Sequence, residues 1–431
     1  MSKMNRRDFV KATGALGAAA AMGITAGCNA TSGGSKSAGG AKGHVVVVGG
    51  GFGGATCAKY LRKADKGIQV TLIEKDTTYY TCPFSNRVIG QLDKLDRVAF
   101  NYGAMKGHGV NVIHDTVTEV NAAAHTVKTA GGQTISYDKL VMSPGISMKY
   151  ESVPGYSKAA SAKAPHAWKA GMQTQLLADQ IKAMKPGENF LMVAPPNPYR
   201  CPPGPYERAS LVGHFLKQHK PGSKVIILDP KDKFSKQGLF TGGWKKNDLP
   251  IEWVSAAQGG KISAVNVDAK EIEAEVETYK YGAVNIIPAM KAGEIAHIAG
   301  LTDDKGWCPV ALDTFESTVH KDIYVIGDAS VATGMPKSGY SANSQGKVTA
   351  AAICEALGGA KAGDPRWTNT CYSYVTPEYG ISVAAVYQLQ ADKKKIANMG
   401  GGLTAADGAD NFMESVYAES WWQNITNDMF S

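Results

Sequence analysis

A glycine-rich turn between two short apolar runs constrains the fold more than any other feature of this chain. His44–Val48 is a β-branched run that leads into the turn Gly49–Gly54, and a helical segment, Ala55–Lys63, follows. A second apolar run, Gln69–Ile73, ends in Glu74, which lies 20 residues after the last glycine of the turn. This order of strand, Gly-x-Gly-x-x-Gly, helix, strand and acid is typical of a dinucleotide-binding βαβ unit.

Each residue of this fingerprint has an expected physical task. Gly49 allows the tight turn, Gly51 lets the backbone approach a pyrophosphate, and Gly54 lets the helix pack closely on the strand. The helix N-terminus attracts the phosphate charge. Glu74 is placed to accept hydrogen bonds from a ribose 2′-hydroxyl. The alternative is a glycine-rich loop with a purely structural use.

The N-terminus has the pattern of an export signal. Asn5–Lys11 contains the pair Arg6-Arg7, and Thr13–Gly27 is uncharged, small and weakly apolar. This segment is too short to span a bilayer, which takes about 20 apolar residues. We therefore predict a twin-arginine signal peptide over residues 1–30, a flexible linker over 31–42 and a periplasmic location. A lipid anchor at Cys28 is an alternative end to the signal, and no integral membrane segment is expected in the mature chain.

Composition excludes several classes of protein. The chain of 431 residues is 44% hydrophobic and 19% charged, so it is long enough for two or three folded domains and is not intrinsically disordered. Of the formal charge of +8, residues 1–30 contribute +3, which leaves +5 for the rest. No Lys/Arg block is interleaved with aromatic residues, so no nucleic-acid partner is expected. No Cys-x-x-Cys or Cys-x-x-Cys-His occurs, so neither a zinc ribbon nor a c-type haem on this chain is predicted, and no metal site is assigned.

A second βαβ unit in the middle of the chain lacks a nucleotide fingerprint. The strand Asn189–Ala194 leads into the proline-rich loop Pro195–Glu207, and Lys224–Asp229 has the pattern of the next strand. Proline has no N–H and a fixed φ, so this loop cannot form the nest of backbone donors that a pyrophosphate requires. We expect that the fold was kept while a nicotinamide site was lost, and that electrons come from a donor other than NADH.

Two further segments identify the dinucleotide through a resemblance. The runs Tyr137–Gly145 and Asp322–Asp328 resemble, in order and spacing, the segments that flank FAD in the two-dinucleotide-domain flavoproteins that include glutathione reductase. The resemblance implies that Asp328 bonds the ribityl chain, whereas the alternative is a turn residue that ends a strand. It also implies that the helix beginning at Gly339 and Tyr340 directs its N-terminus at the flavin, where its dipole would stabilise negative charge.

Four cysteine- and asparagine-containing segments narrow the resemblance to one family. These are Tyr79–Cys82 with Ser85-Asn86, Arg200–Arg208, Pro336–Asn343 and Asn369–Ser373. Together they resemble the flavoprotein subunit of flavocytochrome c sulfide dehydrogenase across essentially the whole mature chain.

The family implies roles for particular residues. Cys201 and Cys371 would form a redox-active disulfide over the flavin, Glu207 would be a nearby acid or base, and Cys82 would hold FAD as a thioether. Pro83-Phe84 departs from the family pattern after Cys82, so the covalent bond rests on the cysteine alone.

Alternatives remain open for several of these residues. Glu207 could form a surface salt bridge with Arg208, and Cys82 could be a small buried hydrophobic residue. The other mature cysteines, Cys57, Cys308 and Cys354, are expected to be packing residues.

The expected partner is a separate c-type cytochrome subunit that carries haem c, because reduced FAD must pass its electrons on singly and this chain has no haem attachment site. Residues 404–431 are acidic and aromatic, with Trp421-Trp422 and no Lys or Arg, which suits a protein interface or the wall of a substrate pocket. The predicted reaction is periplasmic oxidation of sulfide to sulfane sulfur or polysulfide. The alternatives are a sulfide:quinone oxidoreductase-like flavoprotein and a flavin-binding interaction protein with structural FAD, and an NADH-dependent disulfide reductase is disfavoured by the missing second fingerprint.

The predicted fold class is α/β, with two Rossmann-like domains, of which the second has no nucleotide fingerprint, and a C-terminal α+β domain. The first part of the FAD-binding domain is expected over residues 43–155 and its second part over 290–360. The central domain is expected over 156–289, and the flavin-covering or interface domain over 361–431.

Overall fold

The computed structural model describes residues 42–405 and 409–431, which lie in one compact unit. The predicted signal peptide, nearly all of the predicted linker and Cys28 lie outside these residues. Within the described ranges, no helix combines the length and the apolar character needed to cross a bilayer.

The first sheet is parallel and contains the predicted dinucleotide unit. Its strand order is β19-β9-β1-β2-β5, and every neighbouring pair runs parallel. The bounds are β1 Gly43–Val48, β2 Ile68–Ile73, β5 Val110–Ile113, β9 Lys139–Met142 and β19 Ile323–Val325. The predicted strands at His44, Gln69, Tyr137 and Asp322 are confirmed. Since β19 comes from late in the chain, the last third of the sequence completes the sheet that the first third begins.

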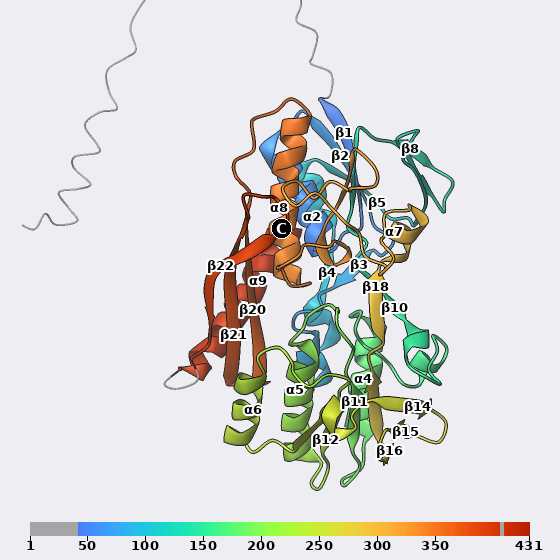
Figure 1. Cartoon of the computed structure of the whole chain (residues 1–431), viewed down its shortest axis with the longest axis vertical. Coiled ribbons are helices and arrows are strands. Elements are labelled where there is room, and N and C mark those ends of the chain that lie inside the picture. The colour runs from blue at the N-terminus through green and yellow to red at the C-terminus, as the bar shows by residue number, and fades with distance from the viewer. Residues whose placement is uncertain (1–41, 406–408) are drawn as a thin grey trace, which may run out of the picture. The chain divides into compact units, whose positions relative to one another are not determined.

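Two helices, α2 (Phe52–Ala64) and α8 (Gly339–Ala356), cross closely beside this sheet (Figure 1). Glycine makes the crossing tight, since a Cβ at Gly346 would lie 2.6 Å from the carbonyl oxygen of Gly53. The smaller elements around this sheet are β3 Thr78–Tyr80, α3 Ser85–Ile89, η1 Leu95–Val98, β4 Ala99–Asn101, η2 Gly103–His108, β6 Val117–Asn121, β7 Thr126–Thr129, β8 Thr134–Ser136, α7 Glu294–Ile298 and η6 Gly327–Ala329.

The second parallel sheet has the order β13-β12-β11-β17. Its elements are β11 Phe190–Val193, β12 Val225–Leu228, β13 Ile251–Val254 and β17 Ala283–Ile286, with the helices α4 Met172–Ala183, α5 Gly204–His219 and α6 Gln237–Lys246. A separate antiparallel sheet of β14 Ile262–Asn266, β15 Glu271–Ala274 and β16 Thr278–Lys280 comes between β13 and β17 in the sequence. The strand β10 Ile146–Lys149 pairs with β18 Ala289–Ala292 where the chain enters and leaves this region. The short helices here are η3 Tyr150–Ser152, η4 Ala160–Ala162 and η5 Ala256–Gln258. The second Rossmann-like unit is therefore confirmed.

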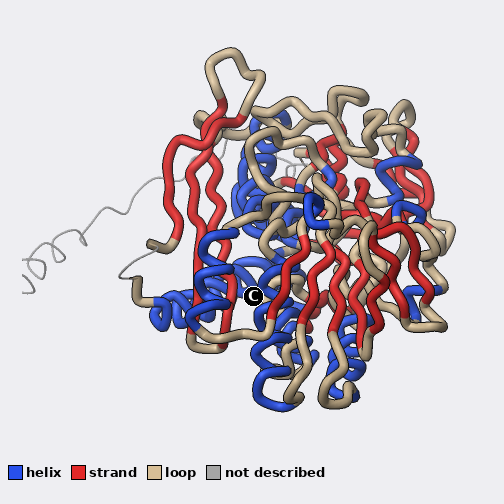
Figure 2. Tube along the Cα trace, turned by 60° about the horizontal axis from the view of Figure 1, so that its bottom comes forward, coloured by secondary structure: helices blue, strands red, loops and turns tan. Residues whose placement is uncertain are grey.

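The C-terminal region is a three-stranded antiparallel sheet and one long helix. The elements are β20 Arg366–Thr376, β21 Tyr379–Leu389, β22 Ile396–Leu403 and α9 Asn411–Phe430. Figure 2 shows the long strands as a group beside the helices that cover the parallel sheets. The predicted C-terminal α+β organisation is confirmed.

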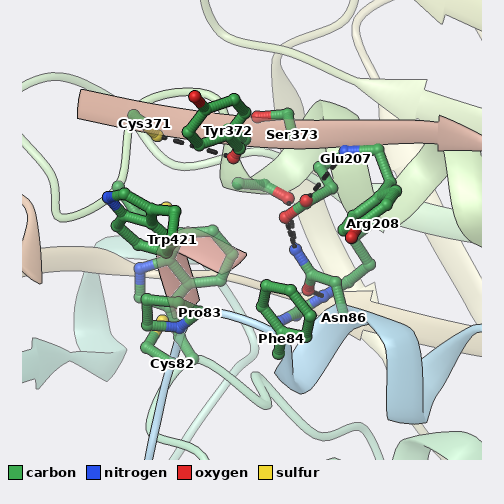
Figure 3. Close-up of a pocket in the computed structure, with 14 residues that line it drawn as sticks. Cys82, Pro83, Phe84, Asn86, Glu207, Arg208, Cys371, Tyr372, Ser373 and Trp421 are labelled. Carbon is green, nitrogen blue, oxygen red and sulfur yellow. Dashed lines mark hydrogen bonds between the residues drawn. The ribbon is translucent and has the colours of Figure 1, made fainter. Parts of the chain in front are cut away.

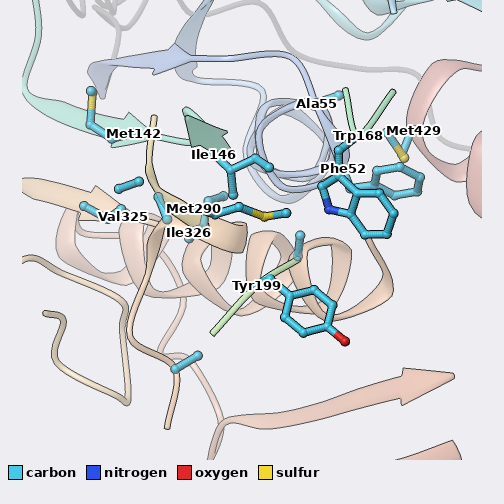
Figure 4. Close-up of a cluster of buried hydrophobic side chains, with 14 of the residues drawn as sticks. Phe52, Ala55, Met142, Ile146, Trp168, Tyr199, Met290, Val325, Ile326 and Met429 are labelled. Atoms are coloured by element: carbon cyan, nitrogen blue, oxygen red, sulfur yellow. The ribbon is translucent and has the colours of Figure 1, made fainter. Parts of the chain in front are cut away.

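One hydrophobic core joins the three regions (Figure 4). It includes Phe52 and Val325 of the first sheet's layer, Trp168 and Tyr199 of the central region, and Met429 of α9. Burial of large apolar side chains from all three regions stabilises their arrangement. The domain boundaries at residues 155, 289 and 360 stay predictions.

Candidate active site

Three cysteines far apart in the sequence line one pocket (Figure 3). Cys82 lies between β3 and α3, Cys201 directly precedes α5, and Cys371 lies within β20. The pocket has a volume of about 40 Å³. One water molecule needs about 10–15 Å³ of such volume, so the pocket has room for only a few small atoms. In the part of the chain that the structure describes, the cysteines are free thiols. The structure brings Cys201 and Cys371 to one site, and their pairing stays a prediction.

The backbone at Cys201 is in the left-handed region, with a φ of 58°. This conformation is uncommon for a residue with a Cβ and typically marks a functional or tightly held position. The N–H of Cys201 donates to the carbonyl of Lys337 over 2.8 Å, and its own carbonyl accepts from the N–H of Gly204. The loop therefore fixes this thiol at the start of α5.

The thiols of Cys82 and Cys201 influence each other's protonation. Hydrogen bonding from Cys201 lowers the pKa of the Cys82 thiol, and the same contact together with burial raises the pKa of Cys201. Burial also raises the pKa of Cys371, and the positive charge of Lys236 opposes that shift. Cys82 is thus the most acidic of the three thiols. A lowered pKa favours the thiolate, which is the nucleophilic form of a cysteine.

Glu207 is half-buried in the first turn of α5 and lines the same pocket. Its carboxylate accepts the backbone N–H of Tyr374 over 3.0 Å and the side-chain amide of Asn86 over 2.7 Å. Burial raises the pKa of Glu207, while these hydrogen bonds and the charges of Lys236 and Arg208 oppose the shift. The alternative of a surface salt bridge with Arg208 is wrong, because Arg208 is only 1% exposed and makes no ion pair with Glu207.

The glycine fingerprint has the geometry that its spacing predicts. Gly49 has a φ of 97°, and a Cβ at Gly54 would lie 1.9 Å from the carbonyl oxygen of Gly49. No side chain caps the N-terminus of α2, whose N-cap residue is Gly51, so its first amides remain free for an anion. Glu74 follows β2 and accepts the N–H of Gly50 over 2.7 Å, which places its carboxylate beside the turn.

Asp328 follows β19 at the same edge of the sheet. Its Oδ1 is buried and has no hydrogen-bond partner among the described residues, and burial raises the pKa of the carboxyl. A buried polar oxygen without a partner is costly, so a hydroxyl supplied by a bound group fits here. Together with the glycine cradle and the free amides of α2, this oxygen fits the ribityl and pyrophosphate parts of FAD.

Gly339 and Tyr340 are the first residues of α8, as predicted. The N-cap Ser338 accepts the N–H of Ser341 over 3.1 Å. The Tyr340 ring lies parallel to that of Trp421, with 6.2 Å between the ring centroids. Trp421 lines the thiol pocket, so the N-terminus of α8 lies beside the pocket wall. The acidic and aromatic C-terminal segment therefore supplies part of a pocket wall, which is one of the two uses expected for it from the sequence.

Two cations beside this site, the buried Lys236 and the half-buried Arg200, had no role assigned from the sequence. Lys236 donates from Nζ to the carbonyl of Cys371 and to the hydroxyl of Ser373, each over 3.0 Å. Arg200 is next to Cys201 in the sequence, and its guanidinium lies 3.8 Å from the Asp328 carboxylate. Arg200 belongs to the cysteine motif and could have been noticed there, whereas Lys236 comes from a polar loop with no local signal.

The remaining described cysteines are packing residues, as expected. Cys57, Cys308 and Cys354 are buried, and burial raises the pKa of each thiol. None of them lines the thiol pocket.

Models of known families match most of the chain. Residues 174–288 match the central domain of the sulfide dehydrogenase [flavocytochrome c] flavoprotein chain, and residues 363–430 match the flavin-binding domain of flavocytochrome c sulphide dehydrogenase. Residues 43–182 match pyridine nucleotide-disulphide oxidoreductases, and residues 3–23 match a twin-arginine translocation signal, so export by that pathway is confirmed.

Individual relatives agree with these matches. The chain is 70% identical over 44 residues to the sulfide dehydrogenase [flavocytochrome c] flavoprotein chain of Chlorobaculum thiosulfatiphilum, which is 10% of this chain and 92% of that sequence. It is 32% identical over 302 residues to the nitric oxide reductase FlRd-NAD(+) reductase of Escherichia fergusonii, covering 67% of this chain and 73% of that protein. It is 26% identical over 317 residues to the mitochondrial sulfide:quinone oxidoreductase of Mus musculus, covering 68% of this chain and 66% of that protein, just under two thirds of its length.

The fold is also found in solved structures. The sulfide:quinone oxidoreductase of Aquifex aeolicus superposes with a TM-score of 0.65 at 16% identity, over 90% of this chain and 92% of that one. At this identity the likeness shows the fold alone. With the family matches and the thiol pocket taken together, the chain belongs to the flavocytochrome c sulfide dehydrogenase flavoprotein family, a flavin-binding group of oxidoreductases within the pyridine nucleotide-disulphide oxidoreductases.

Proposed function

We propose that this chain oxidises sulfide to sulfane sulfur or polysulfide in the periplasm, using FAD and a redox-active disulfide between Cys201 and Cys371. The observation that carries the proposal is the meeting of these two cysteines and Glu207 in one pocket, although Cys371 lies far from the others in the sequence. FAD, when bound, accepts a pair of electrons and releases them one at a time. We propose that a c-type cytochrome subunit with haem c takes them.

The disulfide supplies the first step. The sulfur of hydrosulfide attacks one sulfur of the Cys201–Cys371 bond, which forms a persulfide on that cysteine and frees the other as a thiolate. Lys236 lies beside Cys371 and stabilises negative charge there, so Cys371 is the better leaving group and Cys201 the cysteine that is attacked. The sulfur of hydrosulfide is oxidised, and the disulfide accepts its two electrons.

Glu207 accepts the proton of the new persulfide. Its carboxylate lines the pocket, and its raised pKa brings it closer to neutral pH, where a general base is most useful. The hydrogen bonds from Tyr374 and Asn86 hold the carboxylate in place. Deprotonation of the persulfide by Glu207 gives an anionic sulfur for the next transfer.

We propose that Cys82 attaches FAD as a thioether. It is the most acidic thiol of the pocket, and it lies on the chain between the glycine fingerprint and α3. After denaturation, the purified protein should keep its flavin absorbance and a mass increase equal to FAD. A Cys82→Ala variant should release the flavin on denaturation.

Anaerobic addition of sulfide tests the main proposal. Sulfide should bleach the flavin absorbance of the wild type, and cytochrome c should restore it. NADH should not bleach it, because the central region has a proline-rich loop where a nucleotide fingerprint would stand. Bleaching by NADH and not by sulfide would contradict the proposal.

A sulfide:quinone oxidoreductase-like activity is the second candidate, and it is favoured by the relatives of that name. It shares the disulfide and flavin steps and differs in the acceptor. Stopped-flow reoxidation of the sulfide-reduced protein by a soluble quinone and by cytochrome c separates the two. Faster reoxidation by the quinone supports this second candidate.

A further inference from the structure

Arg208 is a fully buried cation that faces the thiol pocket without a carboxylate partner. Its side chain is 1% exposed and lies on the first turns of α5. The guanidinium donates to four neutral acceptors: Asn86 Oδ1 over 3.0 Å, Asn285 Oδ1 over 2.7 Å, and the carbonyls of His166 over 3.2 Å and Ala167 over 2.8 Å. These acceptors fix its position, and none of them carries a formal negative charge.

A buried charge of this kind is costly unless something offsets it. Taking a guanidinium out of water requires a compensating charge or an equivalent set of polar contacts. The Trp168 ring supplies part of this, since its centroid lies 4.9 Å from the centre of the guanidinium. Among the described residues, the hydrogen bonds of the Arg208 guanidinium all go to neutral acceptors. The field of the guanidinium therefore extends into the pocket that Arg208 lines.

Asn86 connects this cation to Glu207 (Figure 3). Its side-chain oxygen accepts from Arg208, while its side-chain nitrogen donates to Glu207 over 2.7 Å and to the carbonyl of Gly204 over 3.2 Å. A hydrogen bond to a charged donor polarises an amide, so the Asn86 N–H becomes a better donor. Arg208 thus acts on Glu207 through Asn86 as well as through space.

We propose that Arg208 is the fixed positive charge that makes this pocket a binding site for a small sulfur anion, hydrosulfide rather than neutral hydrogen sulfide. Asn86 is the positioning residue that couples this charge to Glu207. The inference deepens the proposed function and rests on it. The proton balance is complete, because the anion enters without its acidic proton and the one proton it keeps passes to the carboxylate of Glu207.

Other ionisable groups lie at or beside this pocket. Cys82, Cys201, Glu207 and Cys371 line it, and Arg200, Lys236 and His166 come from the segments packed around it: the loop before α5, the loop before α6 and the segment before α4. Burial lowers the pKa of His166 to about 3, so its ring is neutral and adds no positive charge near neutral pH. Removing the charge of Arg208 also changes the pKa of the groups coupled to it, so Arg208→Lys, which keeps the charge, is compared with Arg208→Gln at each pH.

The test uses the flavin-loaded protein and two substitutions of Arg208. In the wild type, KM for total sulfide should fall as the pH rises through the first ionisation of hydrogen sulfide, and iodide should raise KM without changing kcat. Arg208→Gln should lower kcat/KM by about 30-fold or more and abolish both the fall in KM and the effect of iodide. Arg208→Lys keeps a charge in the pocket and should keep both effects in weaker form.

Arg62→Gln is the matched control. Arg62 also donates to backbone carbonyls, those of Lys66 and Ile68, but it lies on α2 and does not line the pocket. This variant should keep the wild-type KM at each pH. An Arg208→Gln protein that retains its flavin and shows the wild-type dependence of KM on pH and iodide overturns the inference.

Asn86→Asp provides a second variant of nearly the same shape. The new carboxylate would pair with Arg208 and cancel its charge, so iodide should no longer raise KM. This variant therefore tests the inference independently of whether Arg208→Gln folds. Retention of the iodide effect in folded Asn86→Asp contradicts the inference.

A binding measurement separates this inference from the proposed function. Iodide quenching of tryptophan fluorescence should saturate in the wild type, because Trp168 lines the pocket, and should lose this saturable part in Arg208→Gln. If sulfide fails to reduce the wild-type flavin, the proposed function fails while this quenching still tests the charge of the pocket. Equal quenching in both proteins overturns the inference whatever sulfide does.

Discussion

The two parallel sheets of this protein are both Rossmann-like, but the loop after β1 and the loop after β11 differ in composition and in what they hold. After β1, three glycines leave the α2 amides free and the edge of the sheet open to a dinucleotide. After β11, a proline-rich loop fixes Cys201 in a left-handed conformation at the start of α5. The composition of one loop thus decides whether a Rossmann-like unit offers free backbone amides to a phosphate or holds a thiol at the start of a helix.

The acids after the second strand of each sheet differ in the same way. Glu74, after β2, reaches the glycine turn through the N–H of Gly50. Asp229, after β12, is completely buried and accepts from Tyr206 over 2.6 Å, Lys231 over 2.6 Å and Trp253 over 3.0 Å. The chain's own side chains therefore occupy the Asp229 carboxylate, whereas Glu74 reaches the backbone of the glycine turn.

The largest effect is expected at the thiol of the proline loop. Cys201→Ser removes the sulfur that hydrosulfide attacks, so the rate of sulfide-dependent flavin bleaching should fall by ~10³-fold or more, as for loss of a residue that bonds covalently to the substrate. Cys354→Ser, which changes a buried cysteine outside the pocket, should keep the wild-type rate. Stopped-flow bleaching measures both, and full turnover in Cys201→Ser would remove the disulfide from the mechanism.

The glycine turn should be nearly as sensitive, through a different property. A Cβ at residue 54 would lie 1.9 Å from the Gly49 carbonyl oxygen, so Gly54→Ala should lose bound flavin and destabilise the fold by about 1–3 kcal/mol. The ratio of flavin to protein absorbance and the melting temperature report the two effects. Gly107→Ala is the control because nothing lies within 4 Å of its added Cβ. Full flavin content in Gly54→Ala would contradict the assigned cradle.

Glu207→Gln should affect the rate through its proton transfer. The loss of a general base typically costs ~10²–10⁴-fold, and the rise of the wild-type rate with pH through the raised pKa of Glu207 should disappear. An unchanged pH profile would show that another group takes the proton.

The same substitution has a predicted sign for stability. Because the folded-state pKa of Glu207 is raised, the folded protein binds more protons than the unfolded chain between the usual and the raised pKa. The free energy of unfolding of the wild type should therefore fall as pH rises through that interval. Denaturant titrations should show a smaller fall in Glu207→Gln.

The smallest effect on catalysis is expected at Asp229 of the central region. Asp229→Asn weakens the bonds to Lys231 and Tyr206, so it should destabilise the protein by about 1–3 kcal/mol and leave the sulfide reaction unchanged. NADH should still not reduce the flavin. Reduction by NADH in this variant would show that the region retains a usable nucleotide site.

The parallel strands and the fingerprint were predictable because each is local. Spacing alone places Gly49, Gly54 and Glu74 relative to β1 and β2, and the buried runs at β11 and β12 are equally plain in the sequence. The proline loop could be recognised as unable to form a phosphate nest for the same local reason. The meeting of Cys201 with Cys371 was predictable only through a family resemblance, since no spacing rule relates β20 to α5.

The charges of the pocket could not be predicted, because they depend on tertiary packing. A sequence pattern cannot tell that Arg208 turns inward to Asn285 and Asn86 rather than pairing with its neighbour Glu207. Lys236 meets Cys371 only because the loop before α6 packs on β20.

The most direct measurement is peptide mass spectrometry of the purified, flavin-loaded protein with free thiols blocked before any reduction. The proposal predicts a cross-linked pair of peptides containing Cys201 and Cys371, which disappears in step with flavin bleaching when sulfide is added without oxygen. If the blocking reagent labels both cysteines before any reduction, they are free thiols and not a disulfide. That result in a preparation that oxidises sulfide would contradict the proposal.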